Sequence, residues 1–291
     1  MKKKLLTAAI AAAFVVPMAA QANSGPTVYG VAHASVESLD RDERVSGDGT
    51  DLDTWQVRSR QSRVGIKGSE DLGNGLKAVY KMEFQIDIAD TNGAGNVVSR
   101  NQYVGLAGGW GTFLLGRHDT PKKMMTISRD KFNTTLGDMN EVGFTNLAGA
   151  GLTANGGVFQ DNRSNNAITY ISPNFNGLTV AAQVSPRETD EDDGINDDGT
   201  VIAAKYVNGP LYIGAGYEDR EYNGDDNTMT SMDDWDSWRI AGSYQIGDFN
   251  IGGLYEESDG WAHQDGVDAE VWQVSASYAF GNNVIKATYQ V

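Results

Sequence analysis

The 291-residue sequence contains no cysteine, only six prolines, and 23 basic against 39 acidic side chains. Without cysteine there is no disulfide framework, no thiol nucleophile and no cysteine-ligated metal. A formal net charge of −16 argues against the basic surface that nucleic-acid binding requires, so we expect no nucleic-acid partner.

Sequence motifs of catalysis are missing as well. The three histidines, His33, His118 and His263, are isolated from one another and form no HExxH pattern, and there is neither a Gly-x-Ser-x-Gly turn nor a phosphate-binding lysine motif. We therefore expect no catalytic residues, no cofactor and no enzyme activity. A hydrolase whose serine and histidine meet only in the folded chain remains an alternative.

Long apolar runs are absent after residue 22, where nothing approaches the roughly 18 residues of a membrane helix. The first 22 residues differ: Lys2 to Lys4, an apolar stretch from Leu5 to Ala20 and the pattern Ala20-Gln21-Ala22 predict a signal peptide that is cleaved before Asn23. We expect an exported chain with one structural unit over residues 23–291. Loss of three lysines would take its net charge from −16 to about −19.

The repeating pattern in that unit is alternation with a period of two, and residues 75–87 show it best. One face carries Leu76, Ala78, Tyr80, Met82, Phe84 and Ile86, and the other carries Lys77, Val79, Lys81, Glu83, Gln85 and Asp87. Successive side chains of a strand point to opposite faces, so this segment has an apolar surface backed by a charged one. Residues 238–246, 272–280 and 285–291 repeat the pattern.

Short and long connections alternate between about thirteen expected strands. Tight turns of Gly, Asn, Asp and Pro are expected at residues 71–75, 108–111, 174–177, 208–210, 247–248 and 281–283. Long polar connections are expected at residues 40–54, 89–99, 120–162, 187–199, 218–236 and 257–268. Segregation of loops by length is typical of an all-β transmembrane antiparallel barrel with a dry outer face and a wet lumen. A water-soluble β-sandwich is the alternative.

Glycine and aromatic residues fit the barrel. Glycine makes up 35 of the 291 residues, at expected turns and at wall positions such as Gly214, Gly216, Gly242, Gly252 and Gly253. The missing side chain at such wall positions would leave room for the lumen or for a neighbouring barrel. Aromatics near the expected strand ends, among them Tyr29, Trp238 and Trp272, predict the interfacial girdles of a membrane barrel.

Four motifs in order resemble the general diffusion porins of the Gram-negative outer membrane. They are Val28 to Gly30, Ser62 to Leu76 (SRVGIKGSEDLGNGL), Arg100 to Leu106 with Gly111 to Arg117, and Arg163 to Asn165 with Ile168 to Gly177. The resemblance implies a sixteen-stranded barrel in the outer membrane, usually a homotrimer, that passes small hydrophilic solutes and contacts lipid and lipopolysaccharide. It also implies that the long third loop, here about residues 120–162, folds into the lumen.

The same resemblance implies a constriction where loop carboxylates face a ladder of basic wall residues. Arg63, Arg100 and Arg163 resemble the ladder, with Lys81 and Glu83 nearby on the lumen face, and Asp138 and Glu141 resemble the loop acids. Val31 stands where some relatives carry a basic residue, so this chain departs from a full ladder. The orientation of Arg58, Arg60 and Arg117 is open, because the strand parity there does not decide it.

The acidic excess lies mostly in the expected outer loops and predicts a weak cation preference, opposed by the arginines. Clusters such as residues 190–194 would bind Ca²⁺ or Mg²⁺ weakly and bridge to lipopolysaccharide, but a solvated loop is the simpler interpretation and no EF-hand is present, so no metal site is assigned. Two alternatives stay open: a substrate-selective outer-membrane channel, and a secreted acidic Ca²⁺-dependent β-sandwich adhesin.

The end of the sequence departs from the expected barrel. It stops at Tyr289-Gln290-Val291, in mid-strand after about thirteen strands, whereas bacterial single-chain barrels have an even number. At about twenty residues per strand, sixteen strands would need roughly fifty to sixty residues more. The pattern therefore predicts an incomplete sequence.

Overall fold

The fold consists almost entirely of strands. A computed structural model describes residues 18–19, 25–41, 52–89, 97–134, 138, 161–186, 197–221, 234–260 and 268–291. The strands are β1 (Met18–Ala19), β2 (Thr27–Val31), β3 (Ala34–Arg41), β4 (Leu52–Ser59), β5 (Arg63–Gly73), β6 (Leu76–Ile86), β7 (Val97–Gly108), β8 (Gly111–Asp119), β9 (Arg163–Ile171), β10 (Leu178–Pro186), β11 (Asp197–Asn208), β12 (Leu211–Arg220), β13 (Trp235–Ile246), β14 (Phe249–Asp259), β15 (Ala269–Phe280) and β16 (Asn283–Gln290). The helical elements are α2 (Pro121–Thr126) and the 3₁₀ turn η1 (Ile127–Arg129).

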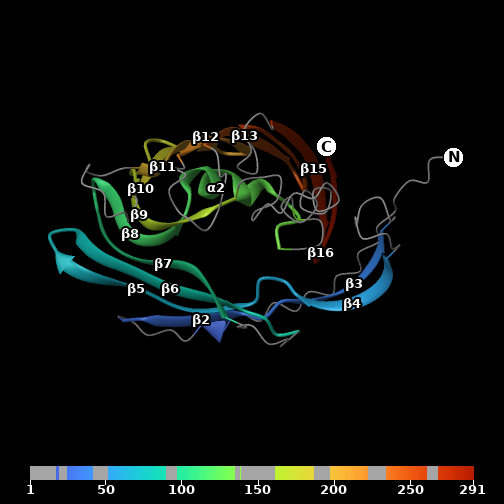
Figure 1. Ribbon diagram of the computed structural model, residues 1–291, viewed down its shortest axis with the longest axis horizontal. Helices are drawn as coiled ribbons and strands as arrows, with labels where there is room; N and C mark the ends of the chain where they lie inside the picture. Colours follow the sequence, from blue (N-terminus) through green and yellow to red (C-terminus); the bar gives the residue numbers. More distant parts are fainter. Residues whose placement is uncertain are drawn as a thin grey trace.

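Antiparallel pairing joins the strands into one fourteen-stranded sheet with the order β1-β2-β5-β6 and then β7 to β16 in sequence, while β3 and β4 form a separate pair. The sheet bends through β5–β7, β8–β10 and β11–β13 to β15 and β16, and α2 lies inside the curve (Figure 1). The described strands therefore form a meander around an interior, and not the two packed sheets of the β-sandwich alternative. Among these residues no pairing joins β16 to β2.

The first two long strands are each interrupted at the same level. Residues 32–33 separate β2 from β3, and residues 60–62 separate β4 from β5. The two breaks are held together: the His33 amide donates to Ser62 Oγ at 2.9 Å, and the Arg60 amide donates to the His33 carbonyl at 2.8 Å. Counting each interrupted pair as one strand, the described residues after β1 form the thirteen strands that the sequence predicted.

The tight turns lie where turn chemistry predicted them. Residues 74–75, 109–110, 209–210, 247–248 and 281–282 connect strand pairs at one end of the sheet, which we call the short-turn end. Asn74 and the glycines Gly75, Gly209, Gly247 and Gly281 have positive φ, which glycine and asparagine adopt at low cost. The strand ends that flank the long connections lie at the opposite end, which we call the long-loop end, as the predicted segregation requires.

The two faces of the sheet differ as the alternation predicted. The convex face exposes large apolar side chains along every strand from β5 to β16; the list includes Ile66, Met82, Leu106, Leu115, Ile168, Ile202, Ile213, Trp238, Ile240, Tyr244, Ile251, Trp272, Val274, Tyr278 and Ile285. The concave face carries buried polar groups such as Glu83, Glu218, Arg239 and Glu256. Within the described residues no helix is long and apolar enough to span a membrane.

The segment after β8 lies against the inner face of the sheet. Met125 packs with Ala181 and Ala203, and Ile127 packs on a cluster of Ala241, Leu254 and Val271. Two glycines of β12 make room for this segment. A Cβ on Gly214 would lie 2.5 Å from the Met125 carbonyl oxygen, and one on Gly216 would lie 3.0 Å from Lys122 Cα. The missing side chains at Gly214 and Gly216 thus leave room for the segment inside the sheet.

Candidate functional site: a charged lumen

Glu83 on the inner face of β6 is the centre of a first charged cluster. Its carboxylate lies 2.7 Å from Arg100 Nε, 3.1 Å from Lys81 Nζ and 3.8 Å from Arg63 Nε. The Glu83 side chain is only 5% exposed, so these contacts are shielded from bulk water. Three basic groups around one carboxylate leave an excess of positive charge. The structure thus brings together four residues that the sequence predicted for the site.

An aromatic side chain completes this cluster. Tyr29 was expected in the interfacial girdle, but it faces inward, and its hydroxyl donates to Glu83 Oε2 at 2.6 Å. Gly65 allows this, because a Cβ there would lie 2.7 Å from the Tyr29 ring. The girdle prediction was therefore wrong for Tyr29, since a strand-end position does not fix the face. Val31 stands on the same side of β2 and pairs in register with Arg63.

Asp119, at the end of β8, is the centre of a second charged cluster. Its Oδ1 lies 2.8 Å from Arg163 Nε and 3.1 Å from Lys123 Nζ, and its Oδ2 accepts from Asn101 Nδ2 at 2.6 Å. Arg163, predicted for the basic ladder, thus pairs with Asp119 and not with Glu83. Asp119 was not identified from the sequence. The feature that could have indicated it is its position two residues after Arg117, at the end of a strand.

The three arginines whose orientation the sequence left open differ from one another. Arg60 is buried and donates to Glu37 from Nε at 2.6 Å and from Nη2 at 2.5 Å, so it holds the interrupted first strands together. Arg58 is exposed on β4. Arg117 lies at a register shift between Gly116 and His118, where it donates to Asn165 Oδ1 and to the Arg163 carbonyl. That shift is why strand parity could not orient it.

A third charged cluster fixes the inner segment to the opposite wall. Lys122 is fully buried, with Nζ 2.9 Å from Glu256 and 3.5 Å from Glu218. Arg239 lies 2.6 Å from Glu256 and 2.5 Å from Asp161, and it donates to Thr126 Oγ1 at 2.9 Å. Arg220 Nη2 also lies 2.9 Å from Glu218, so three basic groups face three carboxylates. Because the charges are matched, this cluster stabilises the position of α2 and adds little net charge to the lumen.

Asp138, one of the two acids predicted for the inward loop, takes a different place from the wall acids. Asp138 is 1% exposed, and it accepts from the Thr134 amide at 2.6 Å and from Asn133 Nδ2 at 3.2 Å, within its own loop. Glu141 lies outside the described residues, as do residues 190–194, where weak cation binding was considered. In the described part of the chain, no three acidic or histidine side chains converge as metal ligands.

A curved antiparallel sheet with an apolar convex face and charged groups on its concave face defines a passive, water-filled β-barrel channel of an outer membrane. The chain belongs to the Gram-negative porin family, whose profile matches residues 7–291. It is an outer-membrane general diffusion porin, not an enzyme.

Individual proteins that are similar to this chain are also porins. The chain is 32% identical over 263 residues to outer membrane porin protein 32 of Delftia acidovorans, covering 89% of this chain and 70% of the relative. It is 29% identical over 297 residues to an outer membrane porin protein of Bordetella pertussis, covering 93% and 73%. The solved anion-selective porin from Comamonas acidovorans superposes with a TM-score of 0.69 at 24% identity, covering 92% and 78%, which shows a common fold.

Proposed function

We propose that solutes cross this porin between the inner segment, residues 120–162, and the wall formed by β5 to β9, and that this passage favours anions. The observation that carries the proposal is a charge imbalance: the Glu83 and Asp119 clusters hold five basic side chains and two carboxylates, and Arg117, which donates to the Arg163 carbonyl, adds a sixth basic group beside them. The basic groups are Arg63, Lys81, Arg100, Arg117, Lys123 and Arg163. Asp138 and Glu141 remain predicted loop acids of the constriction.

Two opposing contributions set the ion preference. Acidic outer loops predict a weak cation preference, whereas the wall groups favour anions. Charges in the wall act on a passing ion at a few ångströms, while charges at the mouth are screened over a Debye length of about 8 Å at physiological ionic strength. We therefore expect the wall to dominate. The porin from Comamonas acidovorans, which shares the fold, is itself described as anion-selective.

The test is the reversal potential of the reconstituted protein in a planar bilayer under a KCl gradient. We expect a potential displaced toward chloride, and a displacement that shrinks in Lys81→Gln, which removes one basic wall group beside Glu83. Lys77→Gln is the matched control, because Lys77 lies on the same face of the same strand near the short-turn end. A cation-selective potential, or an equal effect of both variants, would overturn the proposal.

The sequence also left a substrate-selective channel as an alternative to the general porin. Liposome swelling with sugars of equal size separates the two, because a general porin sorts solutes by size and a selective channel favours one sugar. We expect equal swelling rates for neutral isomers. A saturable preference for one isomer would identify a selective channel instead.

Assembly and export complete the proposal. The family is commonly trimeric, so we propose a homotrimer in contact with lipid and lipopolysaccharide, exported by a signal peptide over residues 1–22. Gel mobility of unheated and heated samples, together with the mass of the mature chain, tests both parts. A monomer-sized unheated band argues against the trimer, and a mature chain that retains Met1 argues against cleavage.

A further inference from the structure

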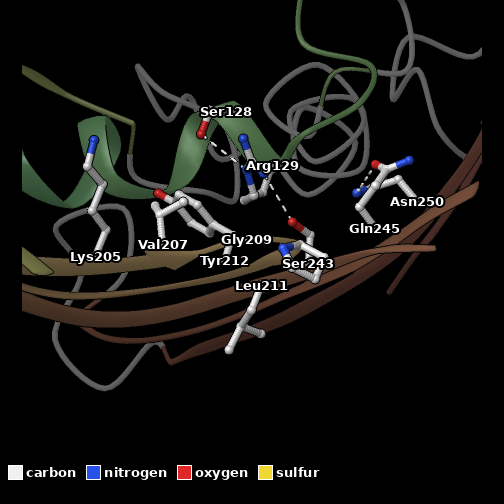
Figure 2. Close-up of a pocket in the computed structure, with 11 residues that line it drawn as sticks. Ser128, Arg129, Lys205, Val207, Gly209, Leu211, Tyr212, Ser243, Gln245 and Asn250 are labelled. Atoms are coloured by element: carbon white, nitrogen blue, oxygen red, sulfur yellow. Dashed lines mark hydrogen bonds between the residues drawn. The ribbon is translucent and has the colours of Figure 1, made fainter. Parts of the chain in front are cut away.

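An open cavity of about 370 Å³ lies between the inner segment and the wall at the short-turn end of the lumen. Ser128 and Arg129 of the helical segment face Tyr212, Ser243 and the strands behind them (Figure 2). The cavity also borders Gly209, Pro210 and Gln245, next to two of the tight turns, so it lies well away from the Glu83 and Asp119 clusters. Its volume is at the lower end of the range for small-molecule sites.

The cavity carries two basic side chains and, among the described residues that line it, no acidic one. Arg129 is held in place: its guanidinium lies 4.2 Å from the centre of the Tyr212 ring, and Nη1 donates to Ser243 Oγ at 3.0 Å. Lys205 projects inward from β11, and in the part of the chain that the structure describes its ammonium makes no hydrogen bond or ion pair. One cation is thus fixed and the other is free to bind.

Positive charge continues beside the cavity. Lys131 donates to the side chain of Asn250, which lines the cavity, and Lys286 donates to the Lys131 carbonyl at 2.8 Å. Asp130, which follows Arg129 in the sequence, accepts from the Phe132 amide through Oδ1 at 2.8 Å and is 6% exposed. The carboxylates that neutralise the cluster around α2 are therefore absent from the lining of this cavity.

The remaining polar groups are neutral and suit hydroxyls. Ser128 on the helical segment and Ser243, Gln245 and Asn250 on the wall offer hydroxyl and amide groups, and Asn250 Nδ2 donates to Gln245 Oε1 at 2.8 Å (Figure 2). Hydroxyl and amide groups both donate and accept, as a polyol requires. Each of the two cations suits a phosphate, which arginine binds in a fork and lysine binds as a point charge.

We propose that this cavity is a binding site for small hydroxylated organic phosphates, of which sugar monophosphates are the simplest, at the short-turn mouth of the pore. Lys205 and Arg129 bind the phosphate, and the serine and amide groups bind the hydroxyls. This inference rests on the proposed passage of anions through the lumen. It deepens that proposal, because it adds a specific binding site for one class of anion to a general anion preference.

The test is block of single-channel current by glucose 6-phosphate in planar bilayers, after the open-channel conductance in plain KCl has been recorded. We expect a saturable block that is stronger from the short-turn side than from the long-loop side. Glucose at the same concentration leaves the current unchanged, and inorganic phosphate blocks more weakly because it lacks the hydroxyls. Lys205→Gln raises the half-blocking concentration about tenfold, the effect of one lost hydrogen bond to a charged group.

Lys77→Gln is the control, since it removes the same charge at the same end of the lumen from the far wall. Equal losses in Lys205→Gln and Lys77→Gln would show a diffuse potential and would overturn the site, as would block by glucose alone or no block at all. If the protein shows no conductance in plain KCl, that result contradicts the porin function itself. A normal conductance and chloride preference without block contradicts only the site.

Discussion

At the scale of single residues, the balance of charge around Glu83 decides how the lumen treats ions. One buried carboxylate holds Arg63, Lys81 and Arg100, and it also accepts from the Tyr29 hydroxyl. A buried ion pair contributes little net stability, but removing one partner leaves an uncompensated charge at high cost. Glu83 is therefore a residue whose loss changes both selectivity and stability.

The substitution Glu83→Gln tests this role. We expect a reversal potential displaced further toward chloride, because three cations lose the carboxylate that they share, and a destabilisation of about 3 kcal/mol. Glu70→Gln is the control, since Glu70 is exposed at the short-turn end and accepts from Tyr80. Reversal potentials and urea unfolding in detergent give the two readouts. An unchanged potential in Glu83→Gln would contradict the role.

Lys131, which lies between η1 and the rest of the inner segment and outside the strands, gives the lumen a pH dependence. Burial and the neighbouring charges of Arg129 and Lys286 lower the pKa of Lys131. As pH rises, its positive charge is lost before that of an ordinary lysine, whose pKa is about 10.4. We expect the chloride preference to fall in this alkaline range, and Lys131→Gln to remove that step. A step retained in the variant would assign it to another group.

At the scale of elements, the short helix α2 depends on the strands behind it. Six residues are too few for a stable isolated helix, so tertiary contacts hold it. Pro121 at its start and Thr120, whose side chain accepts from the Lys123 amide, favour the first turn. Lys122 and the glycines of β12 then fix it against the wall. The inner segment is therefore positioned by buried charge and by missing side chains.

The variant Lys122→Met tests the buried charge. It leaves Glu218 and Glu256 without their shared partner, and we expect a loss of about 3 to 5 kcal/mol together with noisier open-channel current as the inner segment loosens. Lys122→Arg retains the charge and is expected to recover part of the stability. Quiet channels and wild-type stability in Lys122→Met would show that α2 is held by apolar packing alone.

The variant Gly214→Val tests the close approach of strand and helix. Its side chain would overlap the Met125 carbonyl, and overpacking of this kind costs about 1 to 3 kcal/mol. Gly242→Ala on the neighbouring strand is the control, because its Cβ would lie 3.6 Å from the nearest atom, an ordinary contact. Thermal unfolding and single-channel conductance report the outcome. Equal stability of the two variants would contradict the close approach.

At the scale of the whole molecule, the apolar convex face is the surface that places the protein in a membrane. Ile240, in the middle of β13, is 47% exposed, whereas its neighbour Ala241 is 2% exposed and faces the interior. Such alternation in a water-soluble protein would leave a large apolar surface in water, which soluble monomers avoid. In lipid the same surface is the stable one, and hydrogen bonding between strands satisfies the backbone.

The variant Ile240→Lys tests the membrane face. We expect a loss of about 2 to 4 kcal/mol in folding into liposomes, because a charge near the middle of the bilayer is costly. Ile246→Lys on the same face is the control: Ile246 ends the strand beside the turn, where the cost falls to about 0 to 1 kcal/mol. A cost that does not depend on depth would contradict the placement of the strand across the bilayer.

Alternation and turn chemistry are encoded by residues that are neighbours in the chain, so the fold class, the thirteen strands, most of their faces and their tight turns could be predicted without a structure. The sequence also predicted the wall residues Arg63, Lys81, Glu83 and Arg100, which lie on adjacent strands. The partners of the inner segment could not be predicted in this way. Lys122 meets Glu256 across 134 positions and Arg129 meets Ser243 across 114, and nothing local in the chain specifies such pairs. The curvature of the sheet brings these residues together, and it also forms the basic cavity at the short-turn end.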